Sequence, residues 1–361
     1  MSEIKDIRKR LMDNQQYEAS LRPGFPKNML VELTNACNHR CIFCANRKMT
    51  RPVGHIDEAL MLRVLREAFD LGTREVGFYA TGEPFASPNL ARYVGEAKRL
   101  GYTYIYVTTN GALATPPRAR EVIDAGLDSI KFSINAGTRE SYERIHGYDD
   151  FQRVLQNLAF VSEYRKTLER PLKVYVSCVL TRYTEGEQML LRSLVEPLVD
   201  DIVFLNVMNQ GGFMFEVNEY LTVDGPALTR TPPCPMLFNR VHVTHEGYLD
   251  ACCVDYQNYL VVADLNTSSL CDAWHGESFV ELRRKHLAGT LEGTLCYNCL
   301  FNTEMPVEPW MPQYAAAYQP DKSRIAAEMH DRLRGLPADE EQEKTCAPSK
   351  EADVCCYKRS E

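Results

Sequence analysis

The stretch Cys37-Asn38-His39-Arg40-Cys41-Ile42-Phe43-Cys44 follows an apolar run, Met29 to Leu33, that predicts a buried strand. Its three cysteines, spaced C-x3-C-x2-C, are expected on the loop that leaves this strand. Three thiolates can hold three corners of a cubane iron–sulfur cluster and leave one iron free to bind a small molecule. The alternatives are a zinc site or three unrelated buried cysteines. Zinc in a closed structural site usually takes a fourth protein ligand, and His39 lies inside the triplet rather than beyond it.

From Met29 to about residue 207, segments with the pattern of a strand alternate with segments with the pattern of a helix. The predicted strands are Met29–Thr34, Glu75–Ala80, Tyr104–Thr108, Ser129–Ile134, Lys173–Leu180 and Asp201–Val207. The predicted helices between them are Asp57–Leu71, Asn89–Leu100, Pro116–Ala125, Thr138–Ile145 with Phe151–Tyr164, and Glu185–Val199. This alternation predicts an α/β fold with parallel strands, a partial (β/α)6 barrel of the TIM type. In such barrels the chemistry lies at the C-terminal ends of the strands, where the cysteine loop is placed.

Three further motifs end predicted strands in order. Thr81-Gly82-Glu83-Pro84 follows the second strand, Thr108-Thr109-Asn110-Gly111 the third, and Ser133-Ile134-Asn135 ends the fourth. Each alone is also typical of a turn. Together with the cysteine triplet, over about residues 27–210, they resemble the radical S-adenosylmethionine (SAM) superfamily.

The resemblance implies the partial barrel and a SAM-binding site. Cys37, Cys41 and Cys44 would ligate a [4Fe–4S] cluster whose open iron binds the amino and carboxylate groups of SAM. Phe43 would lie beside the adenine. The backbone of Gly82-Glu83-Pro84 would meet the SAM amino group, although Thr81 replaces the first glycine of the usual Gly-Gly-Glu-Pro. Ser133 and Asn135 would reach the ribose or carboxylate.

A second cysteine set, Cys234, Cys252, Cys296 and Cys299, follows a Pro/Gly-containing linker that starts at Asp224. A β-hairpin with its turn at Glu246-Gly247 and a helix over Glu277–Leu287 are predicted between these cysteines. This layout resembles the twitch fold, the short form of the SPASM extension, in which four thiolates ligate one auxiliary [4Fe–4S] cluster. A four-cysteine zinc knuckle is the alternative. Since Leu300–Trp310 contains no cysteine, a second auxiliary cluster is not expected.

Six of the thirteen cysteines belong to neither set. Cys178 is expected in the barrel core and Cys271 is expected to be structural. Cys253 could replace a neighbouring ligand or donate a hydrogen atom to a substrate radical. Cys346, Cys355 and Cys356 lie in a polar segment with the composition of a mobile tail. The vicinal Cys355-Cys356 pair is a candidate redox pair, hydrogen donor, metal ligand or cap.

Composition and charge limit the classes of protein. The chain has 361 residues, 45% hydrophobic and 25% charged, which suggests more than one domain of a soluble protein. We expect a lead-in at 1–26, the barrel at 27–222, the auxiliary domain at 223–312 and a tail at 313–361. The net charge of −8 argues against nonspecific nucleic-acid binding. No apolar run approaches the ~20 residues of a membrane helix. Many cysteines without a secretory signal predict metal ligation in a reducing cytoplasm.

The resemblance implies an enzyme that cleaves SAM to methionine and a 5′-deoxyadenosyl radical, which abstracts hydrogen from its substrate. Flavodoxin or ferredoxin would supply the electron. An auxiliary cluster that accepts an electron gives net two-electron oxidation, as in the butirosin-pathway aminocyclitol dehydrogenase type. The alternatives are a radical epimerase with a cysteine donor, a SPASM enzyme that modifies a ribosomal peptide, and a non-enzymatic iron–sulfur electron carrier.

We expect an oxidation of a small polar substrate, a sugar or an aminocyclitol. Only about 26 residues precede the predicted barrel, and many peptide-modifying relatives carry an N-terminal peptide-binding domain there. Glu83, Pro84 and Ser133 argue against a mere electron carrier, which needs no SAM-binding residues.

Overall fold

The computed structural model describes residues 16–223 and 230–316. The sequence also predicts a helix at about Ile4–Gln16, most of which lies outside these residues, as do Cys346, Cys355 and Cys356.

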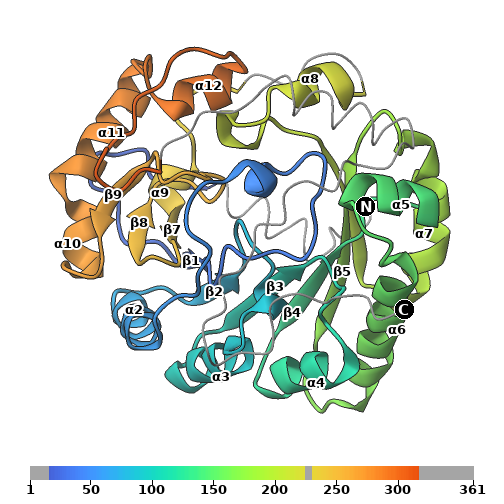
Figure 1. The fold of residues 1–361 in the computed structure, drawn as a ribbon. Coiled ribbons are helices and arrows are strands. Elements are labelled where there is room, and N and C mark those ends of the chain that lie inside the picture. The colour runs from blue at the N-terminus through green and yellow to red at the C-terminus, as the bar shows by residue number, and fades with distance from the viewer. Residues whose placement is uncertain (1–15, 224–229, 317–361) are drawn as a thin grey trace.

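Six parallel strands and the helices around them form a partial TIM-type barrel, as predicted (Figure 1). The strands are β1 (Asn28–Val31), β2 (Glu75–Phe78), β3 (Tyr104–Thr109), β4 (Ser129–Ser133), β5 (Lys173–Leu180) and β6 (Asp201–Asn206). They lie in sequence order, and each pairs in parallel with the next. The helices that cover the outside are α2 (Glu58–Asp70), α3 (Leu90–Leu100), α4 (Pro116–Asp124), α5 (Arg139–His146), α6 (Phe151–Tyr164) and α7 (Gln188–Val195).

Successive side chains of each strand point to opposite faces of the sheet. Met29, Val31, Val76 and Phe78 join the large apolar cluster that the helices cover. The alternate residues face the inside of the barrel. Gly77 is one of them, and a Cβ atom there would lie 2.6 Å from the ring of Tyr106, so the missing side chain makes room for that tyrosine.

The second part of the chain extends the same sheet. β7 (Arg240–Val243) pairs in parallel with β1, and β8 (Tyr248–Asp250) and β9 (Val261–Asp264) continue antiparallel, which gives the order β6-β5-β4-β3-β2-β1-β7-β8-β9. The predicted hairpin is therefore present, with Glu246 and Gly247 in its turn. The helices of this part are α8 (Glu216–Tyr220), α9 (Met236–Asn239), α10 (Leu270–His275), α11 (Glu277–Ala288) and α12 (Leu295–Phe301). The parallel pairing of β7 with β1 was not foreseen from the sequence.

The predicted helix Glu185–Val199 is broken. The structure has a 3-10 turn, η4 (Glu185–Glu187), then α7, then a second turn, η5 (Glu196–Leu198). Pro197 lacks the N–H that an α-helix would need at this point, so α7 ends at Val195. The remaining 3-10 turns are η1 (Ala45–Lys48), η2 (Pro84–Ala86), η3 (Arg165–Thr167) and η6 (Gln210–Gly212).

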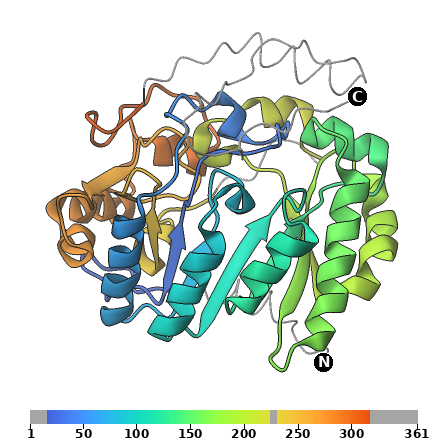
Figure 2. The ribbon, with the colours of Figure 1, turned by 60° about the horizontal axis from the view of Figure 1, so that its bottom comes forward.

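The loops that follow the parallel strands gather at one end of the barrel, at the top of Figure 2, and the cysteine loop lies among them. Within the described residues, every helix falls short of the length and apolarity needed to cross a membrane.

Candidate functional site

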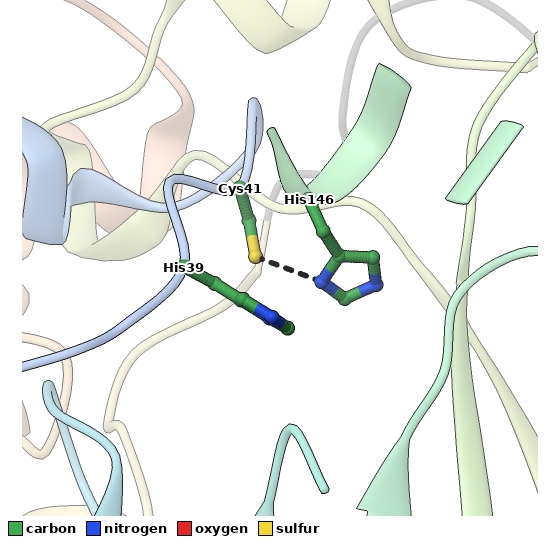
Figure 3. A group of neighbouring side chains, drawn as sticks. All are labelled: His39, Cys41 and His146. Carbon is green, nitrogen blue, oxygen red and sulfur yellow. Dashed lines mark hydrogen bonds between the residues drawn. The ribbon is translucent and has the colours of Figure 1, made fainter. Parts of the chain in front are cut away.

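The loop after β1 presents Cys37, Cys41 and Cys44 to three different neighbours. Asn110 Nδ2, after β3, lies 3.9 Å from Cys37 Sγ. Cys41 Sγ lies 3.3 Å from Nδ1 of His146, at the end of α5, and Figure 3 shows the two side chains pointing toward each other beside His39. Cys44 Sγ lies 3.5 Å from the hydroxyl of Tyr256. The loop is thus fixed from the barrel on two sides and from the second part of the chain on the third.

Burial of these thiols fits a metal-bound thiolate better than a free one. Burial and the nearby Glu83 carboxylate raise the pKa of Cys37 to about 12. Burial also raises the pKa of Cys44. A free thiol here would stay protonated, whereas a bound metal centre stabilises the thiolate. The donor set of three sulfurs on one loop therefore fits a cluster with an open iron.

Gly82 and Glu83 hold the cysteine loop in place. A Cβ atom on Gly82 would lie 2.3 Å from the carbonyl oxygen of Thr34, so the loop passes directly over this position. The Glu83 N–H donates to the carbonyl of Ala36 at 2.8 Å. At Gly82 the structure thus shows a close approach of the chain's own backbone, and the contact of Gly82 with SAM stays a prediction.

The Glu83 carboxylate joins the ends of β2 and β3. It accepts hydrogen bonds from Thr109 Oγ1 at 2.7 Å, from the Asn110 N–H at 2.8 Å and from the Phe85 N–H at 3.0 Å. Burial raises its pKa to about 7, although these three donors lower it. Pro84 is buried as the first residue of η2.

The other expected SAM contacts lie around the same loops. Phe43 is nearly buried in the apolar cluster. Ser133 lies at the end of β4 with its hydroxyl 3.3 Å from that of Ser177, on the inside of the barrel. Asn135 has a positive φ of 59°, and its Oδ1 accepts from the Val179 N–H at 2.9 Å, so it ties the loop after β4 to β5.

The four cysteines of the second set come together although they are far apart in the chain. Cys296 and Cys299 lie on α12, three residues apart. Burial raises the pKa of Cys296, and the charges of Cys234 and Cys299 raise it further. Burial, followed by the charges of Cys253 and Cys299, likewise raises the pKa of Cys252. Four thiols whose charges would interact in this way suit a shared multivalent cationic centre, which would stabilise them as thiolates.

The chemistry of this donor set fits two kinds of centre, because four thiolates can ligate either a zinc ion or a four-iron cluster. Within the described residues, the groups of three ligand atoms that come within 4.8 Å of one another are His39–Cys41–His146 and Glu32–His245–Glu246.

The cysteines outside both sets occupy different surroundings. Cys178 is buried on β5, and Cys271 is exposed on α10. Cys253 lies between the inside of the barrel and the second cysteine set. Burial raises its pKa, Arg240 on the inside of the barrel lowers it, and Cys234 of the second set raises it.

Sequence reasoning missed the side chains that connect the two cysteine sets. The Tyr256 hydroxyl faces Cys44 and donates to Gln210 Oε1 at 2.9 Å, so one buried tyrosine links the cysteine loop to η6. Lys131, Arg240, Tyr79 and Tyr106 on the inside of the barrel were also missed. The sequence did contain a sign of these residues, because a charged side chain occupies an inward position in two of the strands. These side chains are Lys131 in Ser129–Ser133 and Arg240 in Arg240–Val243.

Two family models match this architecture. Residues 31–193 match the Radical SAM superfamily, and residues 234–300 match an iron–sulfur cluster-binding domain, SPASM. The chain therefore carries a radical SAM domain followed by a SPASM domain. These two domains imply SAM and two [4Fe–4S] clusters as cofactors, and the two cysteine sets are the residues that fit the clusters.

The curated relatives match the chain over part of their length. A PqqA peptide cyclase of Gluconobacter oxydans is 36% identical over 126 residues, which are 35% of each chain. A probable GTP 3′,8-cyclase of Saccharolobus solfataricus is 32% identical over 132 residues, 37% of this chain and 42% of the relative. The chain thus spans well under half the length of these relatives.

Solved structures share the fold at low sequence identity. BtrN in complex with AdoMet and 2-DOIA superposes with a TM-score of 0.51 and 20% identity, over 80% of this chain and 98% of BtrN. Streptococcus suis SuiB bound to its precursor peptide SuiA superposes with a TM-score of 0.59 and 14% identity, over 76% of this chain and 69% of SuiB.

Proposed function

We propose that this radical SAM enzyme oxidises a small polar substrate by two electrons. When bound, SAM and its cluster supply the radical chemistry that removes a hydrogen atom from the substrate, and the auxiliary cluster supplies an acceptor for the second electron. Cys37, Cys41 and Cys44 hold the first cluster, and Cys234, Cys252, Cys296 and Cys299 hold the second. An external flavodoxin or ferredoxin in a reducing cytoplasm fits as the electron donor.

The gathering of these four thiols near α12 carries this proposal. A cluster fully ligated by four cysteines has no iron left for a small ligand, so an electron-transfer role suits it. Tyr256 places this part of the chain in contact with the loop of Cys44.

The chain's own residues position the reactants. Glu83 and Gly82 fix the cysteine loop against the end of β2. Polar side chains on the inside of the barrel, such as the Ser133–Ser177 pair, provide hydrogen bonds for a polar molecule. The surrounding loops and α12 cover the strand ends and help to exclude water from a reactive radical.

A peptide substrate is the second candidate. The PqqA peptide cyclase is a relative over part of the chain, and SuiB, which shares the fold, has been solved with a precursor peptide. Radical epimerisation with Cys253 as the hydrogen donor is a further alternative. Its motivation is that Cys253 lies next to Arg240 on the inside of the barrel.

Iron content and SAM cleavage test the cofactor assignment. The anaerobically reconstituted protein should hold about eight iron atoms per chain, the sum of two four-iron clusters. The triple variant C37A/C41A/C44A should lose about half the iron and all release of 5′-deoxyadenosine with dithionite. Retained cleavage in this variant, or stoichiometric zinc at the second set, would contradict the assignment.

The fate of the substrate distinguishes oxidation from epimerisation. With a substrate found by mass spectrometry of candidate molecules, oxidation predicts a product two mass units lighter. Cys299→Ala should then still release 5′-deoxyadenosine but form little product. One deuterium incorporated from D2O, with loss of product in Cys253→Ala, would instead establish the epimerase, because a thiol hydrogen exchanges with solvent before it reaches carbon.

A further inference from the structure

Two cations lie on the inside of the barrel among tyrosines. Lys131 on β4 has its Nζ 6.0 Å from the centre of the Tyr79 ring. Tyr79 and Tyr106 pack edge to face, with their ring centres 5.9 Å apart. Arg240, the first residue of β7, is close enough to affect the pKa of Lys131, Tyr79 and Tyr106. Three separate strands and the residue after β2 thus bring two positive charges and two phenols to one place.

Neither cation has a carboxylate partner. Within residues 16–223 and 230–316, no ion pair of Lys131 or Arg240 is formed, and Arg240 Nε is buried without a hydrogen-bond partner. The Glu75 carboxylate affects the pKa of Tyr106, and it accepts a hydrogen bond from Asn28 Nδ2 at 3.1 Å. The cluster therefore keeps an excess of positive charge.

Such an arrangement is costly in the free protein. A buried cation without a partner pays a desolvation penalty that a nearby anion offsets. Burial and, after it, the charge of the Arg240 guanidinium together lower the pKa of Lys131 to about 8, so the free protein already disfavours the second charge. Arginine stays charged under all these conditions. A purely structural role would be served better by an apolar residue or by a carboxylate partner.

We infer that the inside of the barrel binds an anionic oxygen group, a carboxylate or a phosphate, between Arg240 and Lys131. The guanidinium fork matches either group in a bidentate manner, and the lysine adds a point charge. The Tyr106 hydroxyl donates to Asn28 Oδ1 at 3.1 Å, so the two cations, rather than the phenols, are the groups that would hold the anion. That the bound molecule is the substrate rests on the proposed function. The anion site then narrows the class of substrate to a small acid or a phosphorylated molecule.

The inference argues against an aminocyclitol. An ammonium group brought beside Arg240 and Lys131 would be repelled, since like charges in a desolvated site cost free energy. An acidic or phosphorylated sugar satisfies both the polar lining and the charge. A peptide would have to bring an acidic side chain to this place.

Equilibrium binding of simple anions tests the site. The reconstituted protein, saturated with SAM, is titrated with succinate, with inorganic phosphate and, as a neutral control, with myo-inositol, and the heat of binding is measured. Wild type should bind at least one of the two anions, and the one that binds more tightly identifies the carboxylate or the phosphate class. Arg240→Gln and Lys131→Gln should each weaken that binding by about tenfold or more, the loss expected for one charge-assisted contact.

Matched controls separate this site from general charge effects. Arg99→Gln removes an arginine from the outer helix α3, where it is exposed and paired with Glu96, and should leave anion binding unchanged. Arg240→Lys and Lys131→Arg keep the charge and should retain most of the affinity, which guards against a variant that merely misfolds.

Two results would overturn the inference. The first is absence of binding of both anions to wild type. The second is equal binding by wild type, Arg240→Gln and Lys131→Gln. In either case continued release of 5′-deoxyadenosine would leave the proposed radical SAM activity standing, so the two proposals fail separately.

Discussion

At the scale of single residues, the cysteine loop depends on an absent side chain. Gly82 leaves room for the backbone at Thr34 and Ala36, whose carbonyl oxygens would lie 2.3 Å and 2.7 Å from a Cβ atom. Backbone atoms on both sides cannot yield as a flexible side chain can. Gly82→Ala should therefore move the loop, destabilise the apoprotein by about 1–3 kcal/mol as overpacking does, and lower the iron bound by Cys37, Cys41 and Cys44.

Urea unfolding of the apoprotein and iron analysis after reconstitution measure both effects. Gly186→Ala is the matched control, because a Cβ atom there meets nothing within 4 Å. If Gly82→Ala keeps full iron content and stability, the loop does not depend on this contact.

Lys131 gives the inferred anion site a pH dependence with a defined sign. Its pKa in the folded protein is about 8, below the usual 10.5, so the cation is lost as the pH rises through 8. Succinate binding should be constant below pH 7 and weaken by up to tenfold per pH unit above pH 8. Arg240 stays charged, and burial raises the pKa of Tyr79, Tyr106 and Cys253, so these groups stay protonated in this range.

Calorimetric titrations from pH 6.5 to 9.5 check this dependence. In Lys131→Arg the affinity should stay flat, since the guanidinium does not titrate. The same slope in both proteins would assign the titration to another group.

Among single residues, those that belong to a local motif could be predicted from the sequence, whereas those on the inside of the barrel could not. Cysteine spacing is visible without the fold, because Cys37, Cys41 and Cys44 are neighbours along the chain. Lys131 and Arg240 are more than a hundred residues apart, and only the parallel pairing of β7 with β1 brings them to the same barrel. A contact of this kind carries no local signal.

At the scale of elements, α12 presents half of the auxiliary thiols. Thr294 is its N-cap and accepts a hydrogen bond from the Tyr297 N–H at 3.3 Å. The helix has seven residues, so its stability depends on this end and on packing. Thr294→Ala should cost about 0.5–2 kcal/mol and should reduce iron at the second set while SAM cleavage continues.

Thr294→Ser keeps the capping oxygen and serves as the control. Chemical denaturation and iron analysis of the two variants, side by side, give the measurement. Equal losses in both would mean that the methyl group of Thr294, rather than the cap, supports α12.

Strand and helix periodicity predicted the existence of most barrel elements, and their ends were less well predicted. β5 was predicted with its observed ends, Lys173 and Leu180. β1 was expected to reach Thr34 but ends at Val31. Its apolar pattern continues, yet the Glu32 carboxylate and the Thr34 hydroxyl bond to distant groups, which pulls the chain out of the strand. Tertiary hydrogen bonds of this type override the local pattern.

At the scale of the whole molecule, a buried ion network joins the barrel to the SPASM domain. Arg51, which follows the cysteine loop, bonds to Glu32 and, through Nε at 2.8 Å, to Glu246 in the turn between β7 and β8. His245 Nδ1 lies 2.8 Å from Glu32 Oε1. The Glu32 carboxylate also accepts from the Thr81 hydroxyl. The network thus spans the same junction as the β1–β7 pairing.

The charge of Glu32 depends on this network. Burial would raise its pKa, but Arg51 and then His245 hold it well below the usual value of 4.5. A carboxyl whose pKa is lowered by folding contributes stability above its unfolded pKa and loses it as the pH falls. The apoprotein should therefore lose stability below about pH 4.5, and this part of the loss should disappear in Glu32→Gln.

Removing Arg51 leaves two carboxylates facing each other at the junction, one of them fully buried. Arg51→Leu should lower the free energy of unfolding by about 3–5 kcal/mol, the usual cost of breaking a buried pair from one side. The exposed Arg99–Glu96 pair provides the control, and Arg99→Leu should leave the free energy of unfolding nearly unchanged, because solvent screens such a pair. Urea unfolding at pH 7 measures both. In the double variant Arg51→Leu/Glu32→Gln much of the loss should be recovered, because the uncompensated charge is gone. If the two substitutions instead add without recovery, the network does not couple the barrel to the SPASM domain, and the shared sheet alone holds them together.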